Sequence, residues 1–145
     1  MKKIDAPIIV EGVFDTAIEA VWKSITELNQ MQQWFFKEIV AFEPVVGFKT
    51  SFDIQLEDKN FLHLWTILES EPNKKITYDW RYENHPGVGK VIFELFEENN
   101  QTRLKLTNIV VEDFPQDIPE FKTESCRGGW EYFINQSLKN YLSKI

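Results

Sequence analysis

The chain has 145 residues, of which 43% are hydrophobic and 27% charged, so it belongs to the globular class and is long enough to bury most of an unfolded chain's surface. Its net charge of −7 excludes non-specific nucleic-acid binding and disfavours attraction to anionic membranes. No stretch approaches the ~20 apolar residues of a membrane span, and the apolar run Ala6–Val10 is too short for a signal-peptide core. Cys126 is the single cysteine, which suits a reducing compartment, so we expect a cytoplasmic protein.

The first segment after the terminus reads as a strand followed by two helices. Pro7–Asp15 is rich in β-branched and aromatic residues, as strands are. After it, apolar residues recur at helical spacing from Ala17 to Ile25. A second, shorter helix is expected at roughly Asn29–Trp34.

From Lys37 onward the pattern becomes extended, and turn-forming residues separate short segments. Separators this short, with no helical pattern between them, predict an antiparallel meander. In the segment that contains Phe52 and Ile54, apolar and polar residues alternate, so one face of the sheet is apolar and the other polar. The six expected strands are Lys37–Pro44, Phe48–Leu56, Phe61–Pro72, Lys74–Tyr82, Lys90–Glu98 and Gln101–Glu112.

A long helix is predicted at the C-terminus, from about Pro119 to Lys144, because apolar residues recur there at spacings of three and four. Its stripe is long enough to cover the apolar face of the sheet. We therefore expect an α+β fold in one domain over residues 1–145: a curved antiparallel sheet of about seven strands wrapped on the long C-terminal helix, with two short helices after the first strand.

Gly128 and Gly129 interrupt this helix, and each costs roughly 1 kcal/mol relative to alanine in a helix interior. Two interpretations stay open. Either the glycines let sheet backbone or a large aromatic ring pack closely against the helix, or they leave room for a ligand beside it.

Four segments in order resemble one family. They are TAIEAVWKSIT with the later Trp34, ILESEPNKKITYDW, VIFELFEENNQTRLKLTN and GGWEYFINQSLKNYL. Together they are similar to the SRPBCC (START-like) superfamily, and within it to the group related to the C-terminal domain of the activator of heat-shock protein 90 ATPase. The resemblance spans nearly the whole chain and implies a helix-grip fold. It fixes the function less closely, because the superfamily includes lipid carriers, polyketide cyclases and chaperone activators.

Metal and nucleophile chemistry find little support in the sequence. The two histidines and one cysteine show no paired ligand spacing, so we expect no metal site and no cofactor. Cys126 and His63 form the only conceivable Cys–His pair, but Cys126 lies on the apolar stripe and is expected to be an inert buried thiol. We assign no catalytic residue.

Two polar residues are candidates for a pocket. His63 shares strand parity with Trp65, so it faces the interior if that face is concave; the alternative is a structural histidine. Asn108, in phase with Leu106, is either a polar contact inside the sheet or a strand-end cap.

The aromatic residues supply the rest of a candidate pocket, although each alone is explained as core. An empty cavity of about 300 Å³ would cost about 7 kcal/mol, so such a space is filled by rings, water or a ligand. The predicted ligand-binding set is Trp34, Phe52, His63, Trp65, Trp80, Phe93, Asn108, Trp130 and Phe133.

Three functions compete at this point. The first is non-enzymatic binding of a small hydrophobic or amphipathic ligand between the sheet and the C-terminal helix. The second, implied only by the resemblance, is interaction with a chaperone-type partner. The third is a cyclase or hydrolase, against which the scarcity of histidine and cysteine counts. We favour the first, in a monomer or homodimer.

Overall fold

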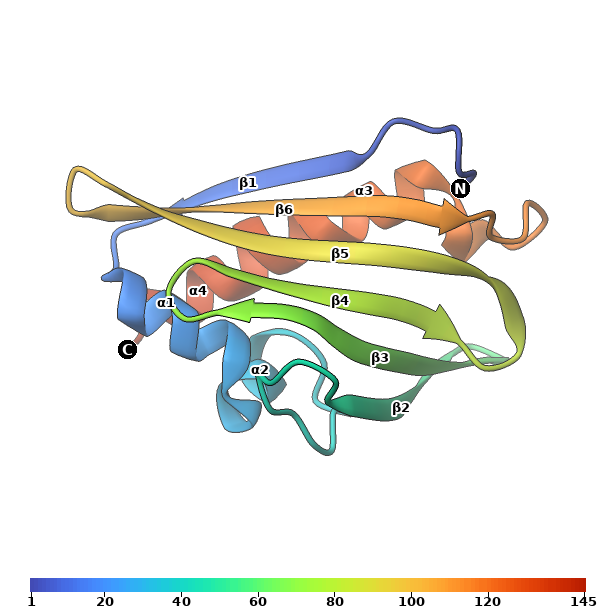
Figure 1. Cartoon of the computed structure of the whole chain (residues 1–145), viewed down its shortest axis with the longest axis horizontal. Helices are drawn as coiled ribbons and strands as arrows, with labels where there is room; N and C mark the ends of the chain where they lie inside the picture. The colour runs from blue at the N-terminus through green and yellow to red at the C-terminus, as the bar shows by residue number, and fades with distance from the viewer.

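A curved antiparallel sheet and a long C-terminal helix form the body of the protein, and a computed structural model describes residues 1–145 (Figure 1). The helix lies behind the sheet in this view, and the two short helices cover one end of it. The elements are β1 (Ile8–Phe14), α1 (Ile18–Thr26), α2 (Leu28–Trp34), β2 (Lys49–Leu56), β3 (Lys59–Glu71), β4 (Lys75–Tyr82), β5 (His85–Glu98), β6 (Gln101–Glu112), the 3₁₀ turn η1 (Pro119–Phe121), α3 (Thr123–Tyr132), the π-helical segment η2 (Phe133–Leu138) and α4 (Lys139–Leu142).

The sheet has six strands in the order β1-β6-β5-β4-β3-β2, and every neighbouring pair is antiparallel. β2 to β6 form the expected meander, and β1 joins it beside β6. The β5–β6 turn is tight because Asn99 and Asn100 both adopt positive φ, at 49° and 67°. Asparagine tolerates this left-handed conformation better than most residues, which favours a two-residue hairpin there.

The predicted α+β helix-grip architecture is confirmed, but the strand expected at Lys37–Pro44 is wrong. This segment forms no strand, and the sheet has six strands rather than seven. Ile39 and Phe42 are buried whereas Val40 is 73% exposed, so the buried positions are three apart and do not alternate. The segment thus packs two apolar side chains into the core as a loop, and ladder bonding to Ile67 begins only at Gly47 and Phe48.

The C-terminal helix is not uniform along its length. The 3₁₀ turn at Pro119–Phe121 precedes α3, and one π-helical segment separates α3 from α4. The side chains it buries against the sheet recur every four residues: Trp130, Ile134, Leu138 and Leu142. Ile145, which follows the last helical residues, is 66% exposed.

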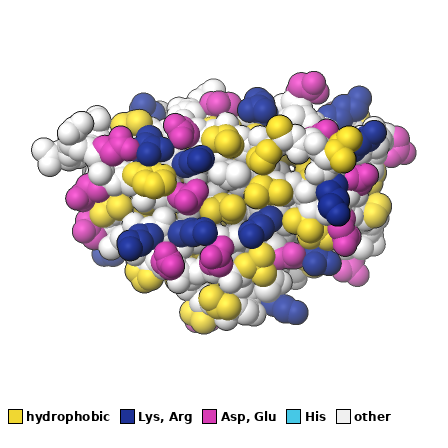
Figure 2. All heavy atoms as spheres, turned by 45° about the horizontal axis from the view of Figure 1, so that its top comes forward, with side chains coloured by type: hydrophobic (Ala, Val, Ile, Leu, Met, Phe, Trp, Pro, Cys, Tyr) yellow, Lys and Arg dark blue, Asp and Glu magenta, His cyan; other side chains and the backbone are white.

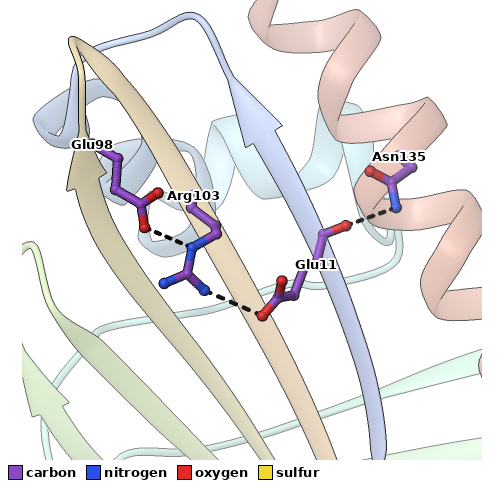
Figure 3. A network of polar contacts seen from close by, with 4 residues as sticks. All are labelled: Glu11, Glu98, Arg103 and Asn135. Carbon is purple, nitrogen blue, oxygen red and sulfur yellow. Dashed lines mark hydrogen bonds and ion pairs between the residues drawn. The ribbon is translucent and has the colours of Figure 1, made fainter.

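The helix and the sheet approach each other closely at Gly12 of β1. A Cβ atom added there would lie 2.8 Å from Cγ2 of Ile134 and 3.0 Å from Oδ1 of Asn135. The Asn135 side chain also donates to the Glu11 carbonyl at 3.1 Å, and Arg103 ties Glu11 to Glu98 on the outer side of the sheet (Figure 3). Gly12 therefore allows the close approach that holds β1 to the helix.

Most of the core is one cluster of 26 buried residues between the sheet and the helices. A second, smaller cluster lies near the start of the C-terminal helix and consists of Phe61, Val110, Phe114 and Phe121. On the face shown in Figure 2, hydrophobic side chains are scattered among acidic and basic ones and form no single patch. None of the helices has the length and apolar character needed to cross a membrane.

Candidate functional site

A cavity of about 220 Å³ lies between the concave face of the sheet and the first half of the C-terminal helix. Hydrophobic residues provide 12 of its 18 lining positions, so its chemistry is mainly apolar. The exposed lining residues Leu56 and Ser125, with the half-buried Glu120, mark its mouth. The other lining residues are Met1, Phe36, Ile54, Phe61, His63, Trp80, Tyr82, Gly89, Asn108, Phe114, Phe121, Cys126, Gly129, Trp130 and Phe133.

The strands place these side chains through their two-residue repeat. Phe61 and His63 face inward from β3, and Trp80 and Tyr82 face inward from β4. His63 pairs directly with Tyr82 in the register, and their ring centroids are 4.7 Å apart. The sheet thus contributes a wall of neighbouring rings.

The helix contributes open space through its glycines. A Cβ atom built at Gly128 or Gly129 would meet no heavy atom within 4 Å, so the close-packing interpretation of this pair is wrong. Gly129 is partly buried and lines the cavity, whereas Gly128 is exposed and does not. The absence of a side chain at Gly129 therefore keeps the cavity open on its helical side.

His63 is the buried titratable group of the cavity, with 6% of its surface exposed. Its Nδ1 lies 2.9 Å from the carbonyl oxygen of Phe61. Because a carbonyl only accepts, Nδ1 carries the proton, and Nε2 is left as an acceptor without a protein partner. Burial lowers the pKa of His63 from 6.5 to about 4, so the ring is neutral at physiological pH.

Two further polar side chains accept a hydrogen bond but have no protein acceptor for their own protons. Trp130 donates from Nε1 to Oδ1 of Asn108 at 3.3 Å, which leaves the two amide protons of Asn108 without a protein acceptor. Trp80 likewise donates from Nε1 to the Tyr82 hydroxyl at 2.9 Å, and the hydroxyl proton has no protein acceptor. The cavity therefore presents unused donors as well as the unused acceptor of His63.

Cys126 lines the same space, but it is a poor nucleophile. Burial raises the pKa of its thiol to about 11, so the reactive thiolate is scarce at neutral pH. This agrees with the inert thiol expected from the sequence. The described chain also contains no group of three or more histidine, cysteine or acidic side chains placed to hold a metal ion.

Three chain segments come together beside the mouth. The N-terminal amine of Met1 donates to the Phe121 carbonyl at 2.8 Å, and the Phe114 N–H donates to the Met1 carbonyl at 3.0 Å. Lys59, at the start of β3, forms an ion pair with Glu120 at 3.0 Å. The terminus, the β2–β3 hairpin and the link before α3 are thereby held together.

The structure brings five of the nine predicted site residues to the cavity: His63, Trp80, Asn108, Trp130 and Phe133. The other four, Trp34, Phe52, Trp65 and Phe93, are buried in the main core and do not line it. Trp34, for example, donates to the Ser24 carbonyl at 2.6 Å.

Sequence reasoning missed several lining residues, notably Phe61, Tyr82, Phe114 and Phe121. Phe61 and Tyr82 share strand parity with the predicted His63 and Trp80, so extending the same alternation would have found them. Phe114 and Phe121 lie in and after the proline-containing link, where no periodic pattern indicates direction.

Comparison with known proteins gives one match to a family model. The family model described as activator of Hsp90 ATPase homolog 1-like protein matches residues 15–143. No curated protein sequence matches the chain significantly.

Solved structures share the whole fold at low identity. Protein MLL2253 from Mesorhizobium loti has a TM-score of 0.75 and 23% identity, covering 96% of this chain and 98% of that one. PFC0360w, an HSP90 activator from Plasmodium falciparum, has a TM-score of 0.74 and 17% identity over 96% and 97% of the two chains. The Aha1 dimer from Colwellia psychrerythraea has a TM-score of 0.69 and 19% identity over 95% and 96%.

Proposed function

The chain belongs to the activator of Hsp90 ATPase homolog 1-like family, and we propose that it binds a small hydrophobic or amphipathic ligand, without catalysis, in the cavity between sheet and helix. The observation that carries this proposal is the cavity itself: about 220 Å³ of mainly apolar space, with a helix glycine on its wall at which an added Cβ would meet no atom within 4 Å. Pockets for small molecules combine such apolar walls with a few placed polar groups.

The pocket opens at a mouth, so water fills it when no ligand is bound. A ligand that displaces this water from mainly apolar walls gains hydrophobic free energy. Helix propensity points the same way, because alanine at position 129 would gain roughly 1 kcal/mol and meet no steric obstacle. Retaining glycine there preserves space at the expense of stability.

The test compares leucine at the two adjacent glycines. Gly129→Leu places a side chain into the cavity, whereas Gly128→Leu makes the same chemical change on the exposed side of the helix. With ethylbenzene as an uncharged apolar probe in isothermal titration calorimetry, we expect binding to the wild type and to Gly128→Leu. We expect at least tenfold weaker binding to Gly129→Leu.

Thermal unfolding of both variants provides the control for folding. Equal affinity in the two leucine variants would show that the probe binds elsewhere. No heat of binding in the wild type would count against the ligand proposal.

A chaperone-type partner is the second candidate, and family membership favours it. Fold neighbours include a protein described as an HSP90 activator. The discriminating measurement is the ATPase rate of a purified Hsp90-type chaperone with and without this protein. A reproducible stimulation that Gly129→Leu leaves unchanged would assign the role to a surface and not to the cavity.

The cellular compartment and the oligomeric state are also proposals. The lone thiol supports a reducing, cytoplasmic setting. We propose a monomer or homodimer, and the dimer described for the Colwellia psychrerythraea protein supports the second state.

A further inference from the structure

Three polar groups on the cavity wall have hydrogen-bonding capacity that no protein atom uses. These are Nε2 of His63, the side-chain amide protons of Asn108 and the hydroxyl proton of Tyr82. His63 and Asn108 are only 6% and 8% exposed as residues, but their unpaired atoms are not among the fully enclosed ones, so they contact whatever molecule occupies the cavity, water or ligand. Polar groups on a pocket wall are normally hydrogen-bonded, so water or a ligand in the cavity completes these contacts.

The three groups amount to one acceptor and two kinds of donor. A hydroxyl group has the opposite requirement, because it donates one proton and accepts through two lone pairs. His63 and Tyr82 face each other across neighbouring strands, and Trp80 and Trp130, with ring centroids 5.7 Å apart, link Tyr82 to Asn108. His63 and Tyr82 are therefore together complementary to one hydroxyl, whereas Asn108 lies on β6, three strands away from β3.

The charges on the cavity wall favour an uncharged ligand. No lysine or arginine side chain lines the cavity. The one cation among the lining residues is the Met1 amine, which already donates to the Phe121 carbonyl, and the Glu120 carboxylate lies at the mouth with Lys59. A buried carboxylate on the ligand would lack a free cationic partner, which is costly.

Size and ring character follow from the walls. A cavity of about 150 Å³ holds benzene, so 220 Å³ suits about nine non-hydrogen atoms by proportion. Aromatic side chains dominate the lining, and they pack well against an aromatic ligand in stacked or edge-to-face geometry.

We propose that the ligand is a compact, uncharged aromatic compound carrying a hydroxyl group, which donates to Nε2 of His63 and accepts from the Tyr82 hydroxyl. This inference rests on the proposed function and specifies the ligand class of the same cavity.

The experiment compares three probes of similar size on the wild-type protein by calorimetry at neutral pH: 4-ethylphenol, ethylbenzene and 4-methylbenzoate. The phenol is uncharged at this pH because its pKa is near 10. We expect 4-ethylphenol to bind about tenfold more tightly than ethylbenzene, as one net hydrogen bond in a buried site provides. We expect 4-methylbenzoate to bind more weakly than either.

Two variants then test whether the hydroxyl of 4-ethylphenol contacts His63. His63→Phe keeps an aromatic ring but removes the acceptor, so the advantage of 4-ethylphenol over ethylbenzene should disappear while ethylbenzene still binds. His85→Phe is the matched control, because His85 does not line the cavity and its variant should keep the tenfold advantage. A phenol advantage that survives in His63→Phe would overturn the role of His63.

The other outcomes separate this inference from the proposed function. Equal affinities for 4-ethylphenol and ethylbenzene would overturn the inference, assign the polar atoms to bound water and leave the apolar cavity in place. Tighter binding of 4-methylbenzoate would overturn it in favour of an anion held by the Met1 amine. If none of the probes binds, both the inference and the proposed function are rejected.

Discussion

At the scale of single residues, the buried imidazole of His63 links stability to pH. Its pKa falls from 6.5 in the unfolded chain to about 4 in the folded protein because burial penalises the charged ring. Between these values the unfolded chain binds more protons than the folded protein, so the free energy of unfolding falls as the pH falls. The stabilising contribution is complete above pH 6.5, amounts to about 3 kcal/mol and is lost on acidification to about pH 4.

The prediction concerns the difference between wild type and His63→Phe. Urea unfolding near pH 7 and near pH 4.5 should show a loss of stability that is about 2 kcal/mol larger in the wild type than in the variant. Carboxylates titrate in both proteins, so the comparison isolates the histidine. Equal losses would mean that His63 is not held neutral in the folded protein.

Gly128 and Gly129 give a second residue-scale prediction. Since an added Cβ meets nothing at either position, Gly128→Ala and Gly129→Ala should each raise the free energy of unfolding by about 0.5–1 kcal/mol, through helix propensity and a less flexible unfolded chain. Chemical denaturation measures the change. A loss of stability at position 129 would show that the cavity wall is closer than the structure places it.

At the scale of elements, the contact between β1 and the C-terminal helix depends on Gly12. Gly12→Ala forces a methyl group to within 2.8 Å of Ile134, so either the strand or the helix must shift. We expect stability to fall by about 1–3 kcal/mol, the usual range for overpacking. Gly12→Ala should lower the free energy of unfolding, whereas Gly128→Ala and Gly129→Ala should raise it. Chemical denaturation of all three variants therefore tests opposite expectations for the same glycine-to-alanine change.

The elements themselves were largely predictable because they obey simple periods. Alternation predicted the strands that carry Phe52, His63 and Trp80, and apolar spacings of three and four predicted the helix with Trp130 and Leu138. The same rule failed at Lys37–Pro44, where apolar content imitated a strand but the buried residues are three apart. Local pattern alone does not distinguish a strand from a loop that packs two side chains inward.

The site was harder to predict than the elements. Strand parity showed that Trp65 and Trp80 face inward, but not that Trp65 is enclosed by core while Trp80 borders a cavity. That difference depends on where the helix, Phe114 and Phe121 lie relative to the sheet, which is information from distant parts of the chain. The role of Gly129 was open for the same reason, since its surroundings decide between contact and space.

At the scale of the whole molecule, the space under the sheet is divided between two ends. Near α1 and α2 it is filled by the main core, in which Trp34 and Phe93 are almost fully buried. Near the start of α3 it contains the cavity, bordered by Phe61, Phe114 and Phe121 of the smaller cluster. Most buried apolar surface is therefore remote from the cavity mouth, and the matched leucine variants at positions 128 and 129 should both fold.

The junction at the mouth has a kinetic consequence. Two backbone hydrogen bonds of Met1 and the Lys59–Glu120 ion pair join the three segments there. Part-exposed ion pairs of this kind contribute little free energy, and short segments rearrange far faster than a domain unfolds. Under the proposed ligand-binding function, we expect substitutions at this junction to change the rates of ligand entry and exit by a common factor, whereas substitutions on the cavity walls should change the affinity.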